Sequence, residues 1–465
     1  MTNQSRPFGL RDKLGYLFGD FGNDFTFILS TTILMKFYTD VMGVSAGAVG
    51  TIMMLARLVD SFTDVTMGRI CDRSRIVPGV GKFRPWILRM CVPVAAASFL
   101  MYLTAPAVWP YGLRVLYLLV TYLLWGSVFY TAVNIPYGSM ASAISPEPGD
   151  RQSLSTFRTM GGTLAGMIIG ASLPLIAYQK VNGVETLIGP RVTLAAGVFS
   201  LLAIVCYLLC YALTTERVTP QESHAPARFT SVADMLAGAV RNRALISIIA
   251  ASVLVLLAQL TMQNMAGYVY PDYYNNASAQ SASTLLMMGA MLIAAVSAKP
   301  LCGRFGKAEV SAGASLLASV VCLVTFFVRP QSVWTFVLLQ TLCWLGLGVF
   351  SMVCWALITD VIDYAELQSG VREDGQVYAL YSFARKLGQA ISAGVSGWLL
   401  TLIGYVPGSA AQAEGVLSGV FTIATLVPAI GLGLLAAVLA LWYPLHKRQV
   451  DENVERLKEK HSANG

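Results

Sequence analysis

Long apolar segments separated by short polar connections run through almost the whole chain, and they constrain its fold more than any other feature. Each is long enough to cross the roughly 30 Å hydrocarbon core of a bilayer, which takes about 20 apolar residues. Only 12% of the residues are charged, against about 25% in soluble domains. We therefore expect an all-α integral membrane protein with twelve transmembrane helices. The candidate spans are residues 14–40, 47–71, 84–105, 112–142, 153–177, 190–213, 242–270, 279–301, 308–328, 333–364, 376–404 and 416–443.

Basic residues flank these segments mainly on one side of the expected membrane. With both termini in the cytoplasm, the loop after the second segment is strongly basic, and only Arg114, Lys180, Arg191 and Arg329 face outward. This asymmetry is the positive-inside pattern, which predicts both termini inside and an even number of spans. The stretch before residue 14 is polar and basic, so we expect no cleavable signal peptide. The expected location is the bacterial cytoplasmic (inner) membrane.

The longest polar connection divides the chain into two halves. It covers residues 214–241 and separates six expected helices at 1–213 from six at 242–445, with a cytoplasmic tail at 446–465. The basic loop after the second segment recurs in weaker form after the eighth, which is the matching position of the second half. Two six-helix halves with a substrate site between them are typical of a major facilitator transporter.

Several other functions are excluded by composition. The eight cysteines lie in or next to apolar segments and the three histidines lie in polar ones, so disulfides, zinc sites and a histidine relay inside the membrane are not expected. The formal charge of +7 follows topology and not one basic face, so nucleic acid is not an expected partner. Without a nucleophile elbow or phosphate loop, we expect no enzyme activity and no cofactor.

Charged residues inside the second segment mark a candidate coupling site, because an ionisable side chain at bilayer depth is costly unless it faces a polar cavity or a partner. The sequence RLVDSFTD places Arg57, Asp60 and Asp64 on one helical face. A structural ion pair with a neighbouring helix is the alternative, above all for Arg57. Two carboxylates against one arginine leave an excess negative charge, and such a pair readily takes up a proton or another monovalent cation.

Polar residues in the first, fourth and fifth segments predict a substrate site. In GDFGND, the deeper Asp24 is expected to bind substrate and Asp20 to lie at the cytoplasmic interface. Arg158 lies about a turn inside the fifth segment and needs an anionic or hydroxylated partner. In NIPYGS, Pro136 is expected to interrupt the fourth helix and expose carbonyls that coordinate a cation or a hydroxyl. The small-residue stripe of the fifth segment is typical of helix packing, and consists of Gly162, Gly166 and Gly170.

Charged residues of the second half predict a gate and a further cavity charge. Asp360, Asp363 and Arg372 lie near the end of the tenth segment, where salt bridges can close the cytoplasmic mouth, and Arg151 is assigned to the same gate. Arg385 and its neighbour Lys386 lie about 100° apart on a helix, so only one points straight into a cavity. The other is expected to snorkel or to pair with the acids of the tenth segment.

These segments together resemble the glycoside-pentoside-hexuronide:cation symporter family over nearly the whole chain. The most specific pieces are, in order, GDFGND, KFYTDVMG, RLVDSFTDVTMGRICD, GKFRPWIL, NIPYGS, DVIDYAELQSGVREDG and RKLGQA. The resemblance implies the major facilitator fold and alternating-access symport of a sugar with H+ or Na+. It assigns cation binding to Asp60, Asp64, Thr131 and Asn134. It assigns the substrate cavity to Asp24, Tyr130, Arg158, Trp355, Arg385 and Lys386.

Two departures from the family pattern bear on the ion and the sugar. A member of the family has an aspartate where this chain has Asn134, and losing that carboxylate favours protons over sodium. Arg385 replaces a small apolar residue, and with Arg158 and Lys386 it could neutralise a carboxylate or sulfonate. We therefore expect an anionic glycoside, such as a hexuronide. Neutral pentosides or oligosaccharides are the alternative, since Asp24 repels an anion unless it is paired.

Two further functions stay open at this point. A lysolipid carrier would call for an apolar cavity in place of the charged residues, and a non-transporting sugar sensor would bind its sugar without exchanging it. The expected partners are a sugar or glycoside, a monovalent cation and the lipid bilayer. We expect the protein to be a monomer.

Overall fold

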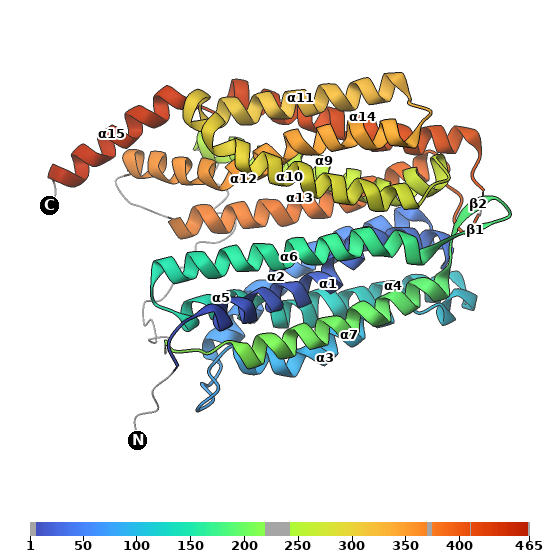
Figure 1. Cartoon of the computed structure of the whole chain (residues 1–465), viewed down its shortest axis with the longest axis horizontal. Coiled ribbons are helices and arrows are strands. Elements are labelled where there is room, and N and C mark those ends of the chain that lie inside the picture. Colours follow the sequence, from blue (N-terminus) through green and yellow to red (C-terminus); the bar gives the residue numbers. More distant parts are fainter. Residues whose placement is uncertain (1–5, 219–241, 370–373, 410, 464–465) are drawn as a thin grey trace. The chain divides into compact units, whose positions relative to one another are not determined.

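The computed structural model of the chain describes residues 6–218, 242–369, 374–409 and 411–463. Its contacts divide the chain into two compact units, each a bundle of long helices (Figure 1). Unit 1 is Met1–Pro226 with Gly397–Ala413, and unit 2 is Ala227–Ser396 with Glu414–Gly465. The connection was expected at 214–241, and its residues 219–241 lie outside the described residues.

Unit 1 contains long helices, one short hairpin and one π-helical segment. Its elements are α1 (Leu10–Asp40), α2 (Ala46–Arg73), α3 (Arg84–Leu100), a 3-10 turn (Ala105–Val108), α4 (Tyr111–Leu123), the π-helical segment (Leu124–Tyr130), α5 (Thr131–Ile144), α6 (Pro148–Ala177), β1 (Tyr178–Val181), β2 (Val184–Leu187) and α7 (Gly189–Leu213). The antiparallel strands β1 and β2 are joined by Asn182 and Gly183, whose φ of 53° and 83° suit a two-residue hairpin turn.

Glycines let α1 approach its neighbours α5 and α6 closely. A Cβ on Gly161 of α6 would lie 2.4 Å from the carbonyl oxygen of Leu17, and one on Gly19 of α1 would lie 2.2 Å from the ring of Tyr137. Neither position has room for a methyl group. These contacts fix the register between α1 and the helices that carry the polar residues of unit 1.

The last turns of α13 (Asp374–Leu402) and the segment after it belong to unit 1, where they pack on α1 and α2. The ammonium of Lys36, only 2% exposed, lies 2.8 Å from Asp40 Oδ2 and donates to Tyr405 Oη at 2.8 Å. Tyr405 Oη in turn donates to Asp40 Oδ1 at 2.9 Å. Trp398 Nε1 donates to Thr51 Oγ1 at 2.9 Å. This closed network satisfies a buried lysine.

Unit 2 is built from the other long helices and from a polar C-terminal helix. Its elements are α9 (Arg243–Tyr268), a π-helical segment (Val269–Tyr273), α10 (Ser278–Phe305), α11 (Lys307–Val328), α12 (Val333–Ser369), the first part of α13, α14 (Glu414–Ala437), a second π-helical segment (Val438–Trp442) and α15 (Lys447–Ala463). Asn242 caps α9 by accepting from the backbone N–H groups of Ala244 and Leu245. Gly306, with φ of 103°, makes the sharp turn from α10 to α11.

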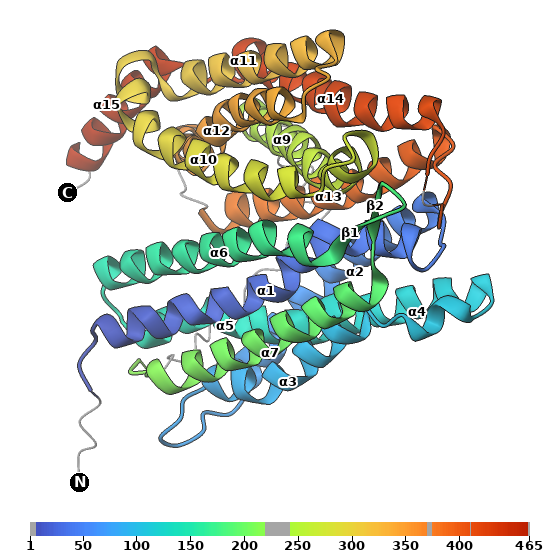
Figure 2. The same ribbon diagram turned by 45° about the vertical axis from the view of Figure 1, so that its right-hand side comes forward.

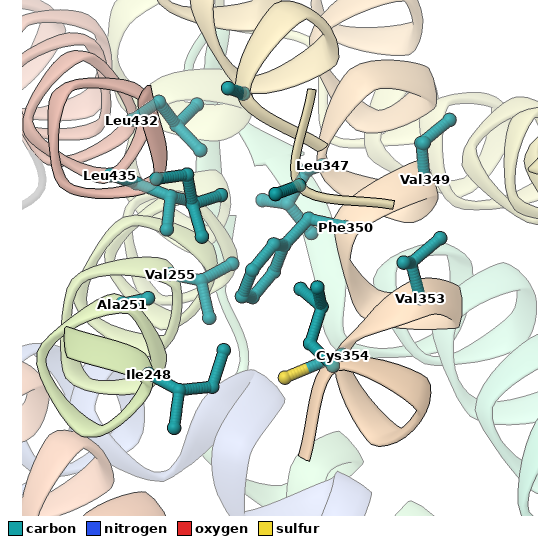
Figure 3. Close-up of a cluster of buried hydrophobic side chains, with 14 of the residues drawn as sticks. Ile248, Ala251, Val255, Leu347, Val349, Phe350, Val353, Cys354, Leu432 and Leu435 are labelled. Atoms are coloured by element: carbon teal, nitrogen blue, oxygen red, sulfur yellow. The ribbon is translucent and has the colours of Figure 1, made fainter. Parts of the chain in front are cut away.

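The core of unit 2 is apolar and tightly interlocked. Figure 3 shows the ring of Phe350 on α12 pointing toward α9, where Ile248 and Val255 lie, while Leu432 and Leu435 approach from α14. On α9 the buried residues Ile248, Ala251 and Val255 follow one another at spacings of three and four, so one face of the helix is buried in the bundle. The view of Figure 2 shows the same helices running side by side within the unit.

Nine helical segments among the described residues are long and apolar enough to cross a membrane. Their bounds are Arg84–Val108, Tyr111–Ile144, Pro148–Ala177, Gly189–Leu213, Arg243–Tyr273, Ser278–Phe305, Lys307–Val328, Val333–Gln368 and Glu414–Trp442. Three more helices, α1, α2 and α13, are 31, 28 and 29 residues long. These three contain seven of the charged residues singled out above, and such residues lower the hydropathy of a helix.

Candidate functional site

The charged face of α2 forms the first polar cluster of unit 1. Asp60 is only 7% exposed. Its Oδ2 lies 3.3 Å from Nη1 of Arg57, and its Oδ1 accepts a 2.5 Å hydrogen bond from the hydroxyl of Ser127. One turn further along α2, Asp64 Oδ1 accepts from the hydroxyl of Thr131 at 2.9 Å. The two carboxylates share one face of α2, as the helical spacing predicts, and they meet hydroxyls of the segment after α4 and of α5.

Aromatic rings hold the guanidinium of Arg57 in place. It lies 4.9 Å from the ring centre of Phe27 and 5.9 Å from those of Tyr122 and Trp125. A cation over ring faces is attracted by their quadrupoles, and the attraction grows when the cation is desolvated. Because the side chain of Arg57 is only 11% exposed, its charge acts chiefly on Asp60.

The π-helical segment Leu124–Tyr130 places the hydroxyls opposite α2. Such segments insert one residue into a helix and often occur at functional sites. Thr131 Oγ1 lies 3.1 Å from the carbonyl oxygen of Gly126, five residues earlier, as well as 2.9 Å from Asp64. One hydroxyl hydrogen serves only one of these acceptors at a time. The Thr131 hydroxyl can therefore donate its hydrogen bond either to Asp64 or to the Gly126 carbonyl oxygen.

The expectation that Pro136 interrupts the fourth span is wrong. α5 continues through Pro136 from Thr131 to Ile144, and the irregular segment precedes it. A proline removes one intrahelical hydrogen bond without ending a helix whose other bonds are intact. Asn134 lies on α5, half-buried, and its side chain has no hydrogen-bond partner among the described residues.

A second polar cluster joins α1 to α6. Arg158 Nε donates to Asp20 Oδ1 at 3.0 Å, and its guanidinium lies 5.3 Å from the ring centre of Tyr137. The sequence placed Asp20 at the membrane interface and gave the ligand role to Asp24; in the structure the ion pair belongs to Asp20. Only the facing helix could have revealed this pairing.

Gly162 of α6 marks the point where the two carboxylates of α1 converge. A Cβ on Gly162 would lie 2.3 Å from Asp24 Oδ2 and 3.1 Å from Asp20 Oδ2. The glycine stripe was expected to serve packing, and Gly166 and Gly170 are indeed buried. The role of Gly162 was not predicted from the stripe. Its missing side chain leaves space for the carboxylate of Asp24.

Aromatic rings connect the two clusters. Tyr130 stacks on Phe27 with ring centres 5.8 Å apart, and Phe27 in turn supports Arg57. Asp20, Asp24 and Phe27 lie on one face of α1, at helical spacings of four and three. Phe27 thus contacts the arginine of the first cluster and lies on the same face of α1 as the carboxylates of the second.

In unit 2, Arg385 of the adjacent basic pair on α13 lies beside two aromatic rings. Its guanidinium lies 6.0 Å from the ring centre of Trp355 and 5.9 Å from that of Tyr381. Trp355 is half exposed, and its ring meets that of Tyr381 edge-on at 5.1 Å. Lys386 lies half-buried beside them. Exposed aromatic surface beside a cation is suited to binding a sugar ring.

The residues assigned to the gate have separate surroundings. Asp360 Oδ1 lies 2.6 Å from Nζ of Lys307, the first residue of α11, and Asp363 follows one turn later on α12. Arg151, in the first turn of α6, donates to the carbonyl oxygens of Ser145 at 3.1 Å and Pro146 at 2.6 Å in the loop before that helix. Arg372 lies outside the described residues.

Buried carboxylates, hydroxyls and arginines inside long apolar helices are the features of a multi-pass membrane transporter, since they are costly in a bilayer unless they serve a polar pathway. The family model described as MFS/sugar transport protein matches residues 15–447. The chain belongs to this family of the major facilitator superfamily, within its glycoside-pentoside-hexuronide group.

Relatives over nearly the full length agree with this membership. The glucuronide carrier protein homolog of Escherichia coli (strain K12) is 31% identical over 96% of this chain and 94% of its own length. The isoprimeverose transporter of Lactiplantibacillus pentosus is 31% identical over 97% of this chain and 92% of its own. A crystal structure of the nucleoside transporter NupG has the same fold, with a TM-score of 0.61 at 14% identity, over 93% of this chain and 99% of that one.

Proposed function

We propose that the protein is a cation-coupled symporter of a sugar or glycoside, with protons favoured over sodium as the coupling ion. The observation that carries the proposal is the cluster on α2, where Arg57 pairs with Asp60 and a second carboxylate, Asp64, follows one turn later. Arg57 balances one negative charge, so the cluster as a whole takes one monovalent cation. Coupling follows if cation and sugar each bind more tightly when the other is present.

The donor set at this cluster supports protons over sodium. A proton needs one carboxylate, whereas a metal ion needs several oxygen ligands around it. Asp60 Oδ1 already accepts from Ser127 and Oδ2 faces Arg57, which leaves Asp64, Thr131 and the Gly126 carbonyl as ligands. Asn134 brings no further charge.

Uptake by membrane vesicles tests the coupling. Wild-type vesicles should accumulate a labelled glucuronide when an inward proton gradient is imposed, and a protonophore should abolish accumulation. Asp64→Asn should still exchange labelled for unlabelled sugar but should not accumulate it. The matched control is Asp72→Asn, which changes an exposed carboxylate at the end of the same helix. Accumulation by Asp64→Asn as strong as that of wild type would show the coupling proposal to be wrong. Accumulation driven by a sodium gradient alone would overturn the preference for protons.

The substrate we favour is an anionic glycoside, such as a hexuronide or a sulfonated sugar. Arg158, with 39% of its side chain exposed, and Arg385 beside the exposed ring of Trp355 supply positive charge. The relative named as a glucuronide carrier homolog supports this choice. The isoprimeverose transporter supports the alternative of a neutral pentoside or oligosaccharide. A binding screen of uronides, sulfonated sugars and pentosides on the purified protein decides between them, and tight binding of neutral sugars alone would refute the anionic preference.

The proposed topology has twelve spans, because α1, α2 and α13 join the nine apolar segments. We place the protein in the bacterial inner membrane, with both termini in the cytoplasm on the strength of the positive-inside pattern. We propose that it is a monomer. Transport would proceed by alternating access between two six-helix halves. Counterflow of labelled sugar separates this proposal from a sensor, which binds without exchange. Competition by a lysolipid would point to the lipid-carrier alternative.

A further inference from the structure

A cavity in unit 2 borders Lys307, the partner of Asp360. It has a volume of about 710 Å³ and is lined by the last turns of α10, the second half of α12 and the first turns of α15. All three helices belong to unit 2. The volume is in the range of pockets that enclose a small organic molecule, about 300–1,000 Å³.

The cavity lies at the level where the membrane-spanning helices end. α10 ends at Phe305, and the last apolar span ends at Trp442, shortly before the polar helix α15. Figure 2 shows α15 extending beyond the ends of its neighbours in the unit. On α10 the lining residues run from Ala295 to Gly303. This wall of the cavity is therefore about 12 Å long along the helix axis, at 1.5 Å per residue. The cavity therefore covers the depth of lipid headgroups and the first part of their chains.

The deeper wall of the cavity is apolar and is made by small or flexible side chains. Ala295 and Ala298 come from α10, and Met352, Val353 and Ala356 come from α12. The hollow follows from these short side chains, and a Cβ on the neighbouring Gly303 would also meet nothing within 4 Å. This surface fits an alkyl chain and offers nothing to a fully polar solute.

The mouth of the cavity carries three lysines with hydrogen-bond donors to spare. Lys307 donates to Asp360 at 2.6 Å, and Lys447 donates to two carbonyl oxygens at the end of α10. Lys299 is exposed and has no hydrogen bond or ion pair with any residue that the structure describes. Each ammonium has three N–H groups, so the mouth retains several donors for a ligand. Asp451 is the one carboxylate among the lining residues.

We propose that this cavity binds an anionic glycerophospholipid, with the phosphate at the three lysines and the first methylenes of an acyl chain against the alanines. Basic pockets between membrane helices attract anionic headgroups. The apolar wall argues against free phosphate, which fills only the mouth. The lysines argue against a neutral lipid, because such a lipid brings no net negative charge to pair with their ammonium groups.

Cys302 gives a local readout of occupancy. It lines the cavity and is half-buried, whereas the other seven cysteines are buried. A maleimide should therefore alkylate Cys302 first in the folded protein. A lipid in the cavity should slow that reaction.

The experiment measures alkylation of Cys302 by N-ethylmaleimide, using mass spectrometry of the full chain in a neutral detergent. Phosphatidylglycerol should slow alkylation about tenfold, while phosphatidylcholine, glycerol 3-phosphate and inorganic phosphate should not. Lys299→Gln should weaken the apparent affinity for phosphatidylglycerol about fivefold, the share expected of one lysine at a membrane surface. Arg75→Gln, in the exposed loop between α2 and α3, should leave it unchanged.

Three results would overturn the proposal. Equal protection by phosphatidylcholine would mean that the cavity takes any alkyl chain regardless of charge. Equal protection by glycerol 3-phosphate or inorganic phosphate would identify a soluble anion as the ligand. No protection by any of the four, in a preparation that binds sugar normally, would mean that the cavity binds no lipid.

Discussion

Replacing Gly162 with alanine tests the convergence of two carboxylates on α6. The added methyl group would start 2.3 Å from Asp24 Oδ2 and 3.1 Å from Asp20 Oδ2, whereas ordinary contact begins at 3.4 Å. The carboxylate of Asp24 must therefore move by about 1 Å. A side-chain oxygen gives way more easily than backbone does, and alanine favours a helix by about 1 kcal/mol over glycine. We expect the fold to survive and the site to lose its geometry.

A displacement of about 1 Å in a binding constellation can cost on the order of a hundredfold. We expect Gly162→Ala to weaken sugar binding by between about tenfold and a hundredfold, measured by titration of the purified protein, with its melting temperature unchanged or raised. The matched control is Gly149→Ala in the same helix, where a Cβ meets nothing within 4 Å. If Gly162→Ala binds sugar as tightly as wild type, then Asp24 and Asp20 do not bind substrate in the geometry described above.

The remaining predictions concern stability and are measured as melting temperatures of the purified protein. Tyr405→Phe removes the hydroxyl that accepts from buried Lys36 and donates to Asp40. It should lower the free energy of unfolding by about 1–3 kcal/mol, and an unchanged melting temperature would mean that the network contributes nothing. Gly306→Ala forces alanine to a φ of 103°, at a cost of about 1–3 kcal/mol. Gly289→Ala, in open space on α10, should cause no loss. Equal effects of the two would refute the argument from backbone conformation.

The charged face of α2 could be predicted because it depends on local spacing alone. Arg57, Asp60 and Asp64 share a face in any α-helix, and their partners Ser127 and Thr131 lie on the neighbouring span that the resemblance had already singled out. The position of the irregular segment could not be predicted in this way. Proline is a visible signal, yet α5 accommodates Pro136, and the π-helical segment before it contains no proline.

The sequence could not predict which side chains pair with one another between helices. Asp20 and Asp24 differ by one turn, so their order along α1 does not say which of them meets Arg158. The role of Lys307 beside Asp360 was hidden for the same reason. Such pairings depend on the rotation of each helix about its axis, which packing against several neighbours sets together.

The sequence by itself determined that the chain is a membrane transporter of its family, that α2 carries two acids and an arginine on one face, and where most helices begin and end. These properties follow from hydropathy and helical periodicity, which are local. The tertiary structure alone decided that Arg57 rests on three aromatic rings, that Arg158 pairs with Asp20, and that Gly162 makes room for Asp24. Each depends on side chains that meet across helices, with distances fixed by close packing and not by their positions in the chain.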